Sequence, residues 1–366
     1  MIKLINLVGA RPQFVKAAAI SKAIHQHFST TFEEILVHSG QHYDRELSEI
    51  FFEELELSKP KYFITSGSLS QAEQTAKVMI GLEAILIKEK PDILLVYGDT
   101  NTTIAGAITA SKLHIAVCHI EAGLRSFNRD MPEEINRIVT DKLSKWLFCS
   151  TEASVVNLKN EGIDEGVFSC GDIMLDTALR YGNASIDTFL KYKLNPDGYI
   201  LATIHRPSNT DDPKQLLMLL EGLGSNAKKR NLKLFLPLHP RTKSVIDANS
   251  TVFENVLADA TIFIAPALSY LDMLTLEKNS KLIATDSGGV QKEAYFFEKP
   301  CIVLRSETEW VEIVANGCAS LLNENNVEWM DAAFDAMTIN FKGVFNPLFG
   351  DGKAANFILT TLSTKQ

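Results

Sequence analysis

Three acidic residues lie at positions where parallel α/β sheets carry their catalytic and binding residues, after the carboxyl ends of strands and at the start of a helix. Asp99 follows an apolar run from Ile93 to Tyr97, Glu121 follows the next apolar run, and Glu133 lies in the first turn of an expected helix. The carboxyl ends of parallel strands meet at one edge of a sheet, so we expect the three carboxylates to converge on one ligand crevice. Their mutual repulsion should raise the pKa of at least one of them. A raised carboxyl pKa suits acid–base catalysis near neutral pH.

Each of these acids also has an ordinary structural explanation. Asp99 could cap the helix expected from Asn101, and Glu133 could pair with Arg137, four residues later on a solvated helix face. Acidic caps and such ion pairs are common in helical proteins. The grouping of all three acids, rather than any one of them, favours a catalytic site.

The first turn of the chain is a candidate anion site. Residues 2–8 predict a strand, and Gly9-Ala10-Arg11-Pro12 leads into a helix with Pro12 at its first position. The free backbone N–H groups of this turn could bind an anion together with Arg11 and Lys16. The turn matches neither a dinucleotide-binding nor a Walker motif. A solvated helix lysine explains Lys16 equally well.

Histidines also follow expected strands. His42 ends one such segment, and a packing or capping role explains it best. His205 is followed by Arg206, and His239 is followed by a proline and Arg241. In a two-domain enzyme these two histidines would face the acids of the first domain across a cleft. Neither has a Cys or His partner at metal-ligand spacing, so we predict no metal site.

The segment Asp286-Ser287-Gly288-Gly289-Val290-Gln291-Lys292-Glu293 is the sharpest phosphate signal. Small residues let the backbone approach a ligand, and the helix expected to start there directs N–H groups toward it. Glu293, about one turn into that helix, is placed to accept hydrogen bonds from ribose hydroxyls. Ser-Gly-Gly is also common in ordinary loops, so its context decides the interpretation.

Strands and helices alternate along the whole chain, which predicts an α/β fold of two Rossmann-like doubly wound domains facing across a cleft. We predict an N-terminal domain over 1–180, a C-terminal domain over 181–349 and, within 350–366, a helix that packs back on the first domain. The expected strands are 2–8, 35–38, 92–97, 115–120, 146–149, 167–170, 200–204, 232–238, 262–265, 282–285 and 301–304. The expected helices include 12–24, 45–56, 71–89, 151–161, 173–181, 213–229, 270–277, 309–316, 325–338 and 354–362.

Length and composition place limits on the class of protein. The 366 residues suit two domains, and 46% apolar with 22% charged residues is typical of soluble globular proteins. No apolar stretch is long enough to span a membrane and no signal peptide is evident, so we expect a cytoplasmic protein. A net charge of −9 argues against nucleic-acid binding, and five scattered cysteines indicate buried, reduced thiols.

Seven segments, in the same order over almost the whole chain, resemble the non-hydrolysing UDP-N-acetylglucosamine 2-epimerase family. They are G-A-R-P-Q-F-V-K at 9–16, S-G-Q-H at 39–42, G-D-T at 98–100, H-I-E-A-G-L-R at 119–125, P-E-E-I-N-R at 132–137, H-R at 205–206 and D-S-G-G-V-Q-K-E at 286–293. The resemblance implies a GT-B-like pair of domains, UDP held mainly by the second, no cofactor and no metal. It also implies a homodimer that serves cell-surface polysaccharide synthesis.

The chemistry implied by the resemblance is inversion of the sugar at C2. The C2 proton is removed and UDP leaves C1, which gives a glycal with a double bond between C1 and C2; UDP then re-adds after protonation from the opposite face. Asp99, Glu121 and Glu133 match the family's catalytic carboxylates and His205 its catalytic histidine, with the assignment of base and acid left open. The matching substrate-binding and UDP-binding residues are Arg11, Lys16, Arg137, His239, Met273, Ser287, Gly288, Gly289 and Glu293.

Three segments depart from the pattern of the best-known members. T-E-W-V-E at 308–312 replaces T-E-R-P-E and is similar to relatives that act on UDP-2,3-diacetamido-2,3-dideoxy-glucuronate; H-R-P-S-N-T-D at 205–211 replaces an H-R-R-E-N-like stretch. Q-H-Y-D at 41–44 departs from the pattern linked with allosteric binding of a second UDP-sugar. The substrate is therefore open between the two sugars. A hydrolysing epimerase, a GT-B glycosyltransferase and a non-catalytic UDP-sugar sensor are the alternative functions.

Overall fold

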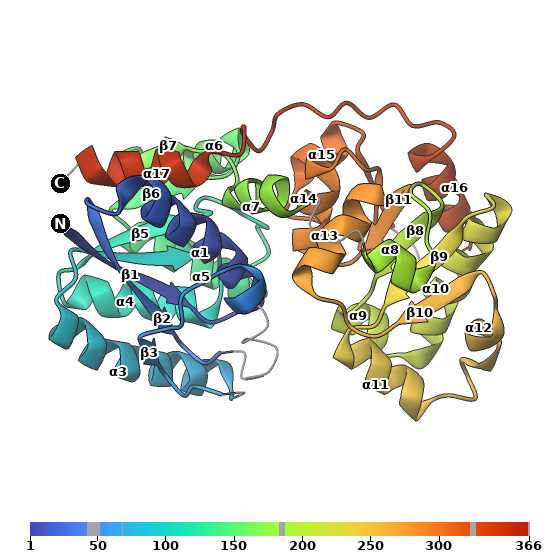
Figure 1. The fold of residues 1–366 in the computed structure, drawn as a ribbon, viewed down its shortest axis with the longest axis horizontal. Helices are drawn as coiled ribbons and strands as arrows, with labels where there is room; N and C mark the ends of the chain where they lie inside the picture. Colours follow the sequence, from blue (N-terminus) through green and yellow to red (C-terminus); the bar gives the residue numbers. More distant parts are fainter. Residues whose placement is uncertain (42–51, 68, 183–186, 323–326, 365–366) are drawn as a thin grey trace. The chain divides into compact units, whose positions relative to one another are not determined.

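A computed structural model describes residues 1–41, 52–67, 69–182, 187–322 and 327–364 (Figure 1). His42, Tyr43, Asp44 and the first part of the helix expected over 45–56 lie outside the described residues. The chain forms two compact units. Unit 1 comprises Met1–Leu179 and Pro347–Gln366, and unit 2 comprises Arg180–Asn346.

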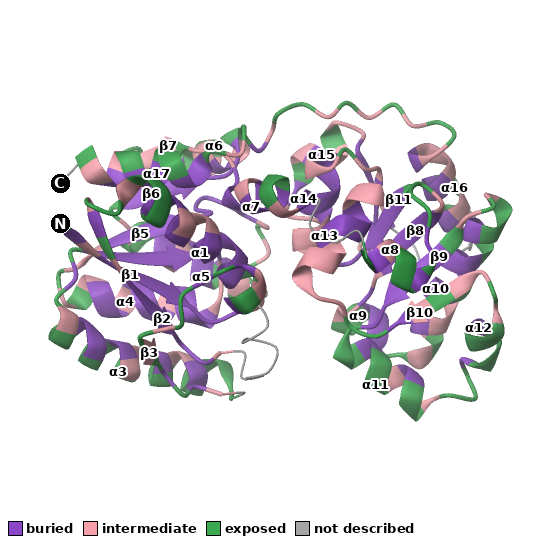
Figure 2. Cartoon of the chain, in the orientation of Figure 1, coloured by how far each residue is buried: buried purple, intermediate pink, exposed green. Residues whose placement is uncertain are grey.

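The described part of unit 1 contains a seven-stranded sheet in which neighbouring strands run parallel, in the order β3-β2-β1-β4-β5-β6-β7. All five residues of β4 are buried, as expected for a strand covered on both faces. Figure 2 shows the strands of this sheet as mostly buried. The strands are β1 (Ile2–Val8), β2 (Phe32–His38), β3 (Tyr62–Phe63), β4 (Ile93–Tyr97), β5 (Ala116–Ile120), β6 (Trp146–Cys149) and β7 (Val167–Ser169).

Helices cover both faces of this sheet. The described helices of unit 1 are α1 (Arg11–Ala23), a π-helix (Ile24–Phe28), α3 (Gln71–Glu89), α4 (Asn101–Lys112), α5 (Pro132–Leu143), α6 (Glu152–Asn160), α7 (Ile173–Tyr181), which runs just past the unit boundary, and α17 (Ala354–Thr364). Helices α3, α4 and α5 pack side by side, while α17 packs against α1 (Figure 1). A core of aliphatic side chains fills the space between β1, β2, β4 and the pair α3 and α4.

The described part of unit 2 repeats this architecture with a six-stranded parallel sheet in the order β10-β9-β8-β11-β12-β13. Its strands are β8 (Tyr199–Thr203), β9 (Lys233–Pro237), β10 (Ile262–Ala265), β11 (Leu282–Thr285), β12 (Cys301–Val303) and β13 (Ala319–Leu321). Its helices are α8 (Asp187–Tyr192), α9 (Pro207–Thr210), α10 (Pro213–Lys229), α11 (Pro240–Ala248), α12 (Glu254–Ala258), α13 (Tyr270–Asn279), α14 (Gly288–Phe296), α15 (Val311–Ala315) and α16 (Val327–Met337).

Both sheets reverse their strand order at one point. In unit 1 the reversal lies between β1 and β4, and in unit 2 between β8 and β11. Connections leave the two central strands in opposite directions there, which opens a crevice at their carboxyl ends. Asp99 follows β4 by two residues, and Asp286 follows β11 directly. The fold thus brings the sequence motifs to the two places where doubly wound sheets bind ligands.

The sequence predicted most elements of this fold but missed several others. Strands β1, β6, β10 and β11 and helices α3, α7 and α10 have the predicted bounds. The short strands β3 and β13 were not predicted, and neither were helices α8, α9, α11 and α12. Helices α9 and α11 each begin at a proline, after Arg206 and His239 respectively, so these basic segments are helix starts rather than loops.

The carboxylate of Asp176, on α7, joins the last helix to unit 1. It accepts hydrogen bonds from the backbone N–H groups of Ala354 (3.1 Å) and Ala355 (2.9 Å), which open α17. Burial raises the pKa of Asp176 to about 6, and these two hydrogen bonds only partly oppose that rise. The carboxylate therefore caps α17, although burial makes its ionised form less stable than it would be in water.

Replacing Asp176 with Asn should flatten the pH dependence of stability. Because the pKa is higher in the folded state than the value near 3.8 of the unfolded chain, the stability contribution of Asp176 is complete below that value. It is lost as pH rises through about 6. Relative to D176N, the wild type should lose about 2–3 kcal/mol of unfolding free energy between about pH 4 and about pH 7, as urea unfolding would measure.

The control for this prediction is Asp164→Asn, which changes an exposed aspartate of the same unit. D164N should follow the wild-type pH curve. Parallel curves for wild type and D176N would show that the Asp176 carboxyl is not perturbed in the folded protein.

Candidate active site

At the carboxyl edge of the sheet in unit 1, two acids and two basic side chains meet. Arg137 of α5 donates to Asp99 Oδ2 through Nη2 (2.6 Å) and Nε (3.0 Å). Lys16 of α1 forms a buried ion pair with the Glu121 carboxylate. A Cβ on Gly98 would lie 3.1 Å from Glu121 Oε2 and 3.4 Å from Lys16 Nζ, so the backbone before Asp99 touches the second ion pair. The alternative explanation of Lys16 as a solvated helix lysine is therefore wrong.

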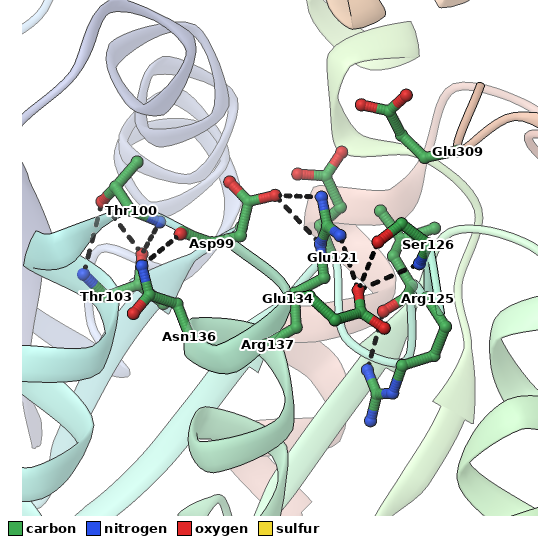
Figure 3. A network of polar contacts seen from close by, with 12 residues as sticks. Asp99, Thr100, Thr103, Glu121, Arg125, Ser126, Glu134, Asn136, Arg137 and Glu309 are labelled. Atoms are coloured by element: carbon green, nitrogen blue, oxygen red, sulfur yellow. Dashed lines mark hydrogen bonds and ion pairs between the residues drawn. The ribbon is translucent and has the colours of Figure 1, made fainter. Parts of the chain in front are cut away.

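The backbone around Asp99 is fixed from both sides. Thr100, rather than Asp99, caps α4: its hydroxyl accepts from the N–H of Thr103 (3.4 Å). The amide of Asn136 donates to the carbonyl of Asp99 (2.8 Å), as Figure 3 shows. The alternative explanation of Asp99 as a helix cap is therefore wrong, and its side chain is left to interact with Arg137.

The pKa of Asp99 is raised, as the sequence predicted for at least one acid. The main cause is burial of the carboxyl group; Arg137 opposes the rise, and the charge of Glu121 adds to it. Repulsion between acids is thus a secondary cause rather than the main one. The Asp99 side chain keeps 30% of its surface exposed, so it remains accessible to a ligand.

Glu134, not Glu133, completes the network of Arg137. Arg137 Nη1 donates to Glu134 Oε2 (2.8 Å), and Glu134 also accepts from the N–H group of Ser126 (2.9 Å) (Figure 3). A third donor is the N–H group of Phe127 (3.0 Å). Burial would raise the pKa of Glu134, but the hydrogen bonds from Ser126 and Arg137 hold it below its usual value. The alternative explanation of Glu133 as an ion-pair partner of Arg137 is therefore wrong.

Glu133 lies beside this network without joining it. It occupies the first turn of α5, as predicted, and is half-buried. Its carboxylate forms no hydrogen bond or ion pair with the residues that the structure describes. Of the predicted trio, the structure therefore brings Asp99 and Glu121 together and leaves Glu133 separate.

The predicted anion site at the first turn is partly occupied by the protein itself. Gln13 Oε1 accepts from the N–H groups of Gly9 (2.8 Å) and Ala10 (3.1 Å). Gln13 Nε2 donates to the carbonyl of Tyr97 on β4 (2.8 Å). Those two N–H groups are therefore not free, which corrects the prediction, and Gln13 instead joins β1 to β4 at the strand-order reversal. Arg11 is half-buried at the start of α1.

Asp286 organises the corresponding edge of unit 2. Its buried carboxylate accepts from the backbone N–H groups of His205 and Arg206 (both 2.9 Å) and from the Asn209 amide (3.0 Å). Burial would raise the pKa of Asp286, but the hydrogen bond and charge of the His205 ring, with the backbone donors, hold it below its usual value. The carboxylate thus joins β8 to β11 across the reversal of strand order.

The His205 ring is oriented by that carboxylate. Its Nδ1 lies 3.1 Å from Asp286 Oδ1, and because Asp286 is ionised, Nδ1 carries the hydrogen of this bond. The ring lies 5.0 Å from that of His239, with an angle of 30° between the planes. The two predicted histidines are therefore neighbours at one edge of the sheet, and Nε2 of His205 is the nitrogen left for a ligand.

The predicted phosphate turn opens helix α14. Ser287 caps the helix, accepting from the N–H of Val290 (3.5 Å). A Cβ on Gly288 would lie 3.3 Å from Glu309 Oε1, so a larger residue would crowd that carboxylate. Glu293, one turn further, accepts from the Tyr270 hydroxyl (2.9 Å). Gly289 follows in the first turn, and Met273 lies on the neighbouring helix α13.

Comparison with known proteins gives the family of this chain. A family model described as UDP-N-acetylglucosamine 2-epimerase matches residues 22–363. The chain belongs to this family. A homolog of UDP-N-acetylglucosamine 2-epimerase from Methanococcus maripaludis is 44% identical, and the alignment covers 99% of each chain. UDP-2,3-diacetamido-2,3-dideoxy-D-glucuronate 2-epimerase of Pseudomonas aeruginosa is also 44% identical, with 99% of each chain covered.

A solved structure supports the same assignment. The Methanocaldococcus jannaschii UDP-GlcNAc 2-epimerase, crystallised with UDP-GlcNAc and UDP, is 39% identical to this chain and superposes with a TM-score of 0.88. The match covers 99% of each chain. The predicted family, the GT-B-like class with two parallel-sheet α/β domains and the isomerase class are confirmed. The protein is a UDP-sugar 2-epimerase.

In this epimerase, the segment 308–312, which differs from the pattern of the best-known family members, packs against helix α14. Thr308 donates to the side-chain oxygen of Gln291 on α14 (2.6 Å). The Lys292 ammonium group lies 4.6 Å from the centre of the Trp310 ring, and both side chains are buried. Trp310 therefore packs over α14, and its Nε1 would lie 3.6 Å from a Cβ on Gly288 in the first turn of that helix.

Glu277 and Glu293 form a second pair of interacting acids, in unit 2. Glu277 is 1% exposed, and burial together with the charge of Glu293 raises its pKa well above the usual value. Two neighbouring carboxylates in a buried site cannot both ionise easily. The proton therefore stays preferentially on Glu277, which keeps Glu293 available as a hydrogen-bond acceptor.

Sequence reasoning missed Gln13, Glu134 and Asp286 as positioning residues. Each lies within a quoted motif, and the available signal was a polar side chain in a segment expected to be buried. Among the described residues, no three His, Cys, Asp or Glu side chains cluster as metal ligands would. Within the same residues, no helix combines the length and apolar character that crossing a membrane requires.

Proposed function

We propose that this epimerase interconverts UDP-N-acetylglucosamine and UDP-N-acetylmannosamine by elimination and re-addition of UDP. The observation that carries the proposal is the pairing of two carboxylates with two cations at the strand-order reversal of unit 1: Asp99 with Arg137 and Glu121 with Lys16. Similarity to an enzyme crystallised with UDP-GlcNAc and UDP supports the choice of substrate.

The proposed reaction begins with removal of the C2 proton by a carboxylate of unit 1. The electron pair forms a double bond between C1 and C2, and the bond from C1 to the UDP oxygen breaks, so that UDP leaves as an anion. A proton then adds to the other face of C2, and the UDP oxygen re-adds to C1. Because the reaction is reversible, the residue that removes the proton in one direction returns it in the other.

Asp99 and Glu121 are the proposed acid–base residues, and Glu133 remains a predicted third one. The raised pKa of Asp99 favours a carboxyl group that can both hold and release a proton. The C2–H group has no adjacent carbonyl, so catalysis needs both a positioned base and stabilisation of the departing UDP. Arg137 and Lys16 hold the carboxylates in place and add positive charge.

Unit 2 is the proposed UDP-binding part. The first turn of α14, with Ser287, Gly288 and Gly289, is proposed to bind the diphosphate, and Glu293 the ribose. Met273 is proposed to contact the uracil, and Arg11 of unit 1 the diphosphate. His205, oriented by Asp286, is proposed to stabilise the departing UDP, with His239 beside it.

Proton NMR in D₂O tests the reaction. Incubation with UDP-N-acetylglucosamine should place deuterium at C2 and produce the C2 epimer with the bond to UDP intact. Release of free UDP and sugar would instead identify a hydrolysing epimerase. Binding without exchange at C2 would identify a sensor or a glycosyltransferase.

A second substrate is favoured by one specific observation. The 44% identical Pseudomonas aeruginosa relative is a 2-epimerase of UDP-2,3-diacetamido-2,3-dideoxy-D-glucuronate. That sugar carries an additional carboxylate and an additional acetamido group, so the two substrates differ in charge as well as in size. Exchange at C2 with this sugar and not with UDP-N-acetylglucosamine would reassign the substrate without changing the chemistry.

The homodimer, the cytoplasmic location and the absence of allosteric UDP-sugar binding remain predictions from the sequence. Light scattering after size-exclusion chromatography tests the dimer, and cell fractionation tests the location. A sigmoidal dependence of rate on UDP-sugar concentration would contradict the absence of allosteric binding.

A further inference from the structure

We propose that His119 is a buried imidazolium cation that positions Asp99 and Glu121. The inference rests on the function proposed above, because it assigns those two carboxylates to the acid–base step. His119 lies on β5, two residues before Glu121, and is 0% exposed. A side chain so buried contacts no ligand, so we class it as a positioning residue.

Both nitrogens of the ring face hydrogen-bond acceptors. Nδ1 lies 2.7 Å from Asp141 Oδ1, and Nε2 lies 2.7 Å from the carbonyl oxygen of Gly98. A carbonyl oxygen cannot donate, so the second contact requires a hydrogen on Nε2. The first contact requires a hydrogen on Nδ1 if Asp141 is ionised. A ring with both hydrogens is a cation.

The surroundings of Asp141 favour its ionised form. Arg125 Nη1 lies 2.8 Å from Asp141 Oδ2, and the N–H of Gly123 donates to the same oxygen (3.2 Å). Arg125 also pairs with Glu161 through Nε (2.6 Å). The chain of partners then consists of two cations, His119 and Arg125, and two anions, Asp141 and Glu161. With one hydrogen between Nδ1 and Asp141 Oδ1 the four groups sum to zero charge, and the two donors to Asp141 Oδ2 favour the arrangement in which His119 holds that hydrogen.

This network fixes the two turns that carry the proposed catalytic acids. The Gly98 carbonyl belongs to the peptide that leads into Asp99, and Gly98 has a φ of +61°. Glu121 has a φ of +72°, a strained conformation for a residue with a side chain. Such strain persists only where the surroundings enforce it, and His119 and Asp141 hold the chain on either side, at Gly98 and Gly123.

The charge on His119 can be measured without substrate. In protein labelled with ¹⁵N-histidine, both ring nitrogens of His119 should resonate in the range of a doubly protonated ring at about pH 7.5. The His119→Gln spectrum assigns the signal by its disappearance. In Asp141→Asn, which removes the paired anion, the same ring should shift to the neutral pattern and so gives a second assignment if H119Q does not fold. A neutral His119 in the wild type would overturn the proposal.

The positioning role predicts a specific kinetic pattern. H119Q, which retains one side-chain donor, should lower kcat by about 10–100-fold, while KM and UDP affinity stay within about twofold of wild type. The matched control is His114→Gln, an exposed histidine just before β5, and it should match the wild type. Wild-type kcat in H119Q, or an equal loss of UDP affinity, would contradict the role. Absence of C2 exchange in the wild type would overturn the proposed function while leaving the measured charge of His119 standing.

Discussion

Replacing Asp99 with Asn should lower kcat by about three orders of magnitude while leaving UDP affinity nearly unchanged. Asn has the shape of Asp but cannot take up or release a proton in the reaction, and a positioned acid or base contributes about 10²–10⁴-fold to the rate. The variant should fold, because Arg137 keeps its second partner, Glu134 (2.8 Å). Initial rates from NMR and UDP binding by calorimetry measure the two quantities separately.

The control for D99N is Asp130→Asn, an exposed aspartate in the loop before α5, which should retain full activity. If D99N kept more than about a tenth of wild-type kcat, Asp99 would not be an acid–base residue, since even the weakest such group contributes more. A loss of UDP affinity in D99N would show that Asp99 is a ligand contact or a structural residue.

Arg137→Met should produce the largest loss of stability as well as a loss of activity. The side chains of Arg137 and Glu134 are 4% and 2% exposed, so removing the guanidinium leaves the Glu134 carboxylate buried without its cation. Breaking a buried pair from one side costs about 3–5 kcal/mol. Urea unfolding at neutral pH should show this decrease in unfolding free energy, and kcat should fall because Asp99 loses two hydrogen bonds.

Two further variants separate charge from packing in this prediction. Arg129→Met removes an exposed arginine from the same segment and should change stability by less than about 0.5 kcal/mol. The double variant E134Q/R137M should regain part of the lost stability, because the stranded charge is gone, but none of the activity. Equal stability of R137M and the double variant would indicate that packing rather than charge accounts for the loss.

The sequence was informative where local pattern and burial coincide. The apolar runs of β6 and β11 are fully buried and gave correct bounds, and the polar residues after β4 and β11 marked the ligand edges. Strands β3 and β13 are two and three residues long, too short to show an alternation. Their assignment depends on pairing with β2 and β12, which the sequence alone does not reveal.

Errors in the predicted site have a common cause. Glu133 and Glu134 are adjacent, and either spacing to Arg137 suits a helix, so only the burial of one face selects Glu134. Gln13 bonds to the carbonyl of Tyr97, which is 84 positions away in the chain. Such contacts follow from the register of strands and helices, and the side chains that make them look like ordinary polar residues in one sequence.

The return of α17 to unit 1 affects the order in which the protein can fold during synthesis. Asp176 and the N–H group of Ala354 that it binds are 178 positions apart, with all of unit 2 between them. A ribosome that adds about 5–20 residues per second needs about 9–36 s to make that interval. Throughout this time the surface of α1 that α17 will cover is exposed to solvent. Unit 2 is one continuous segment of the chain. Its synthesis therefore starts after that of unit 1 but is complete before unit 1 has received its last helix.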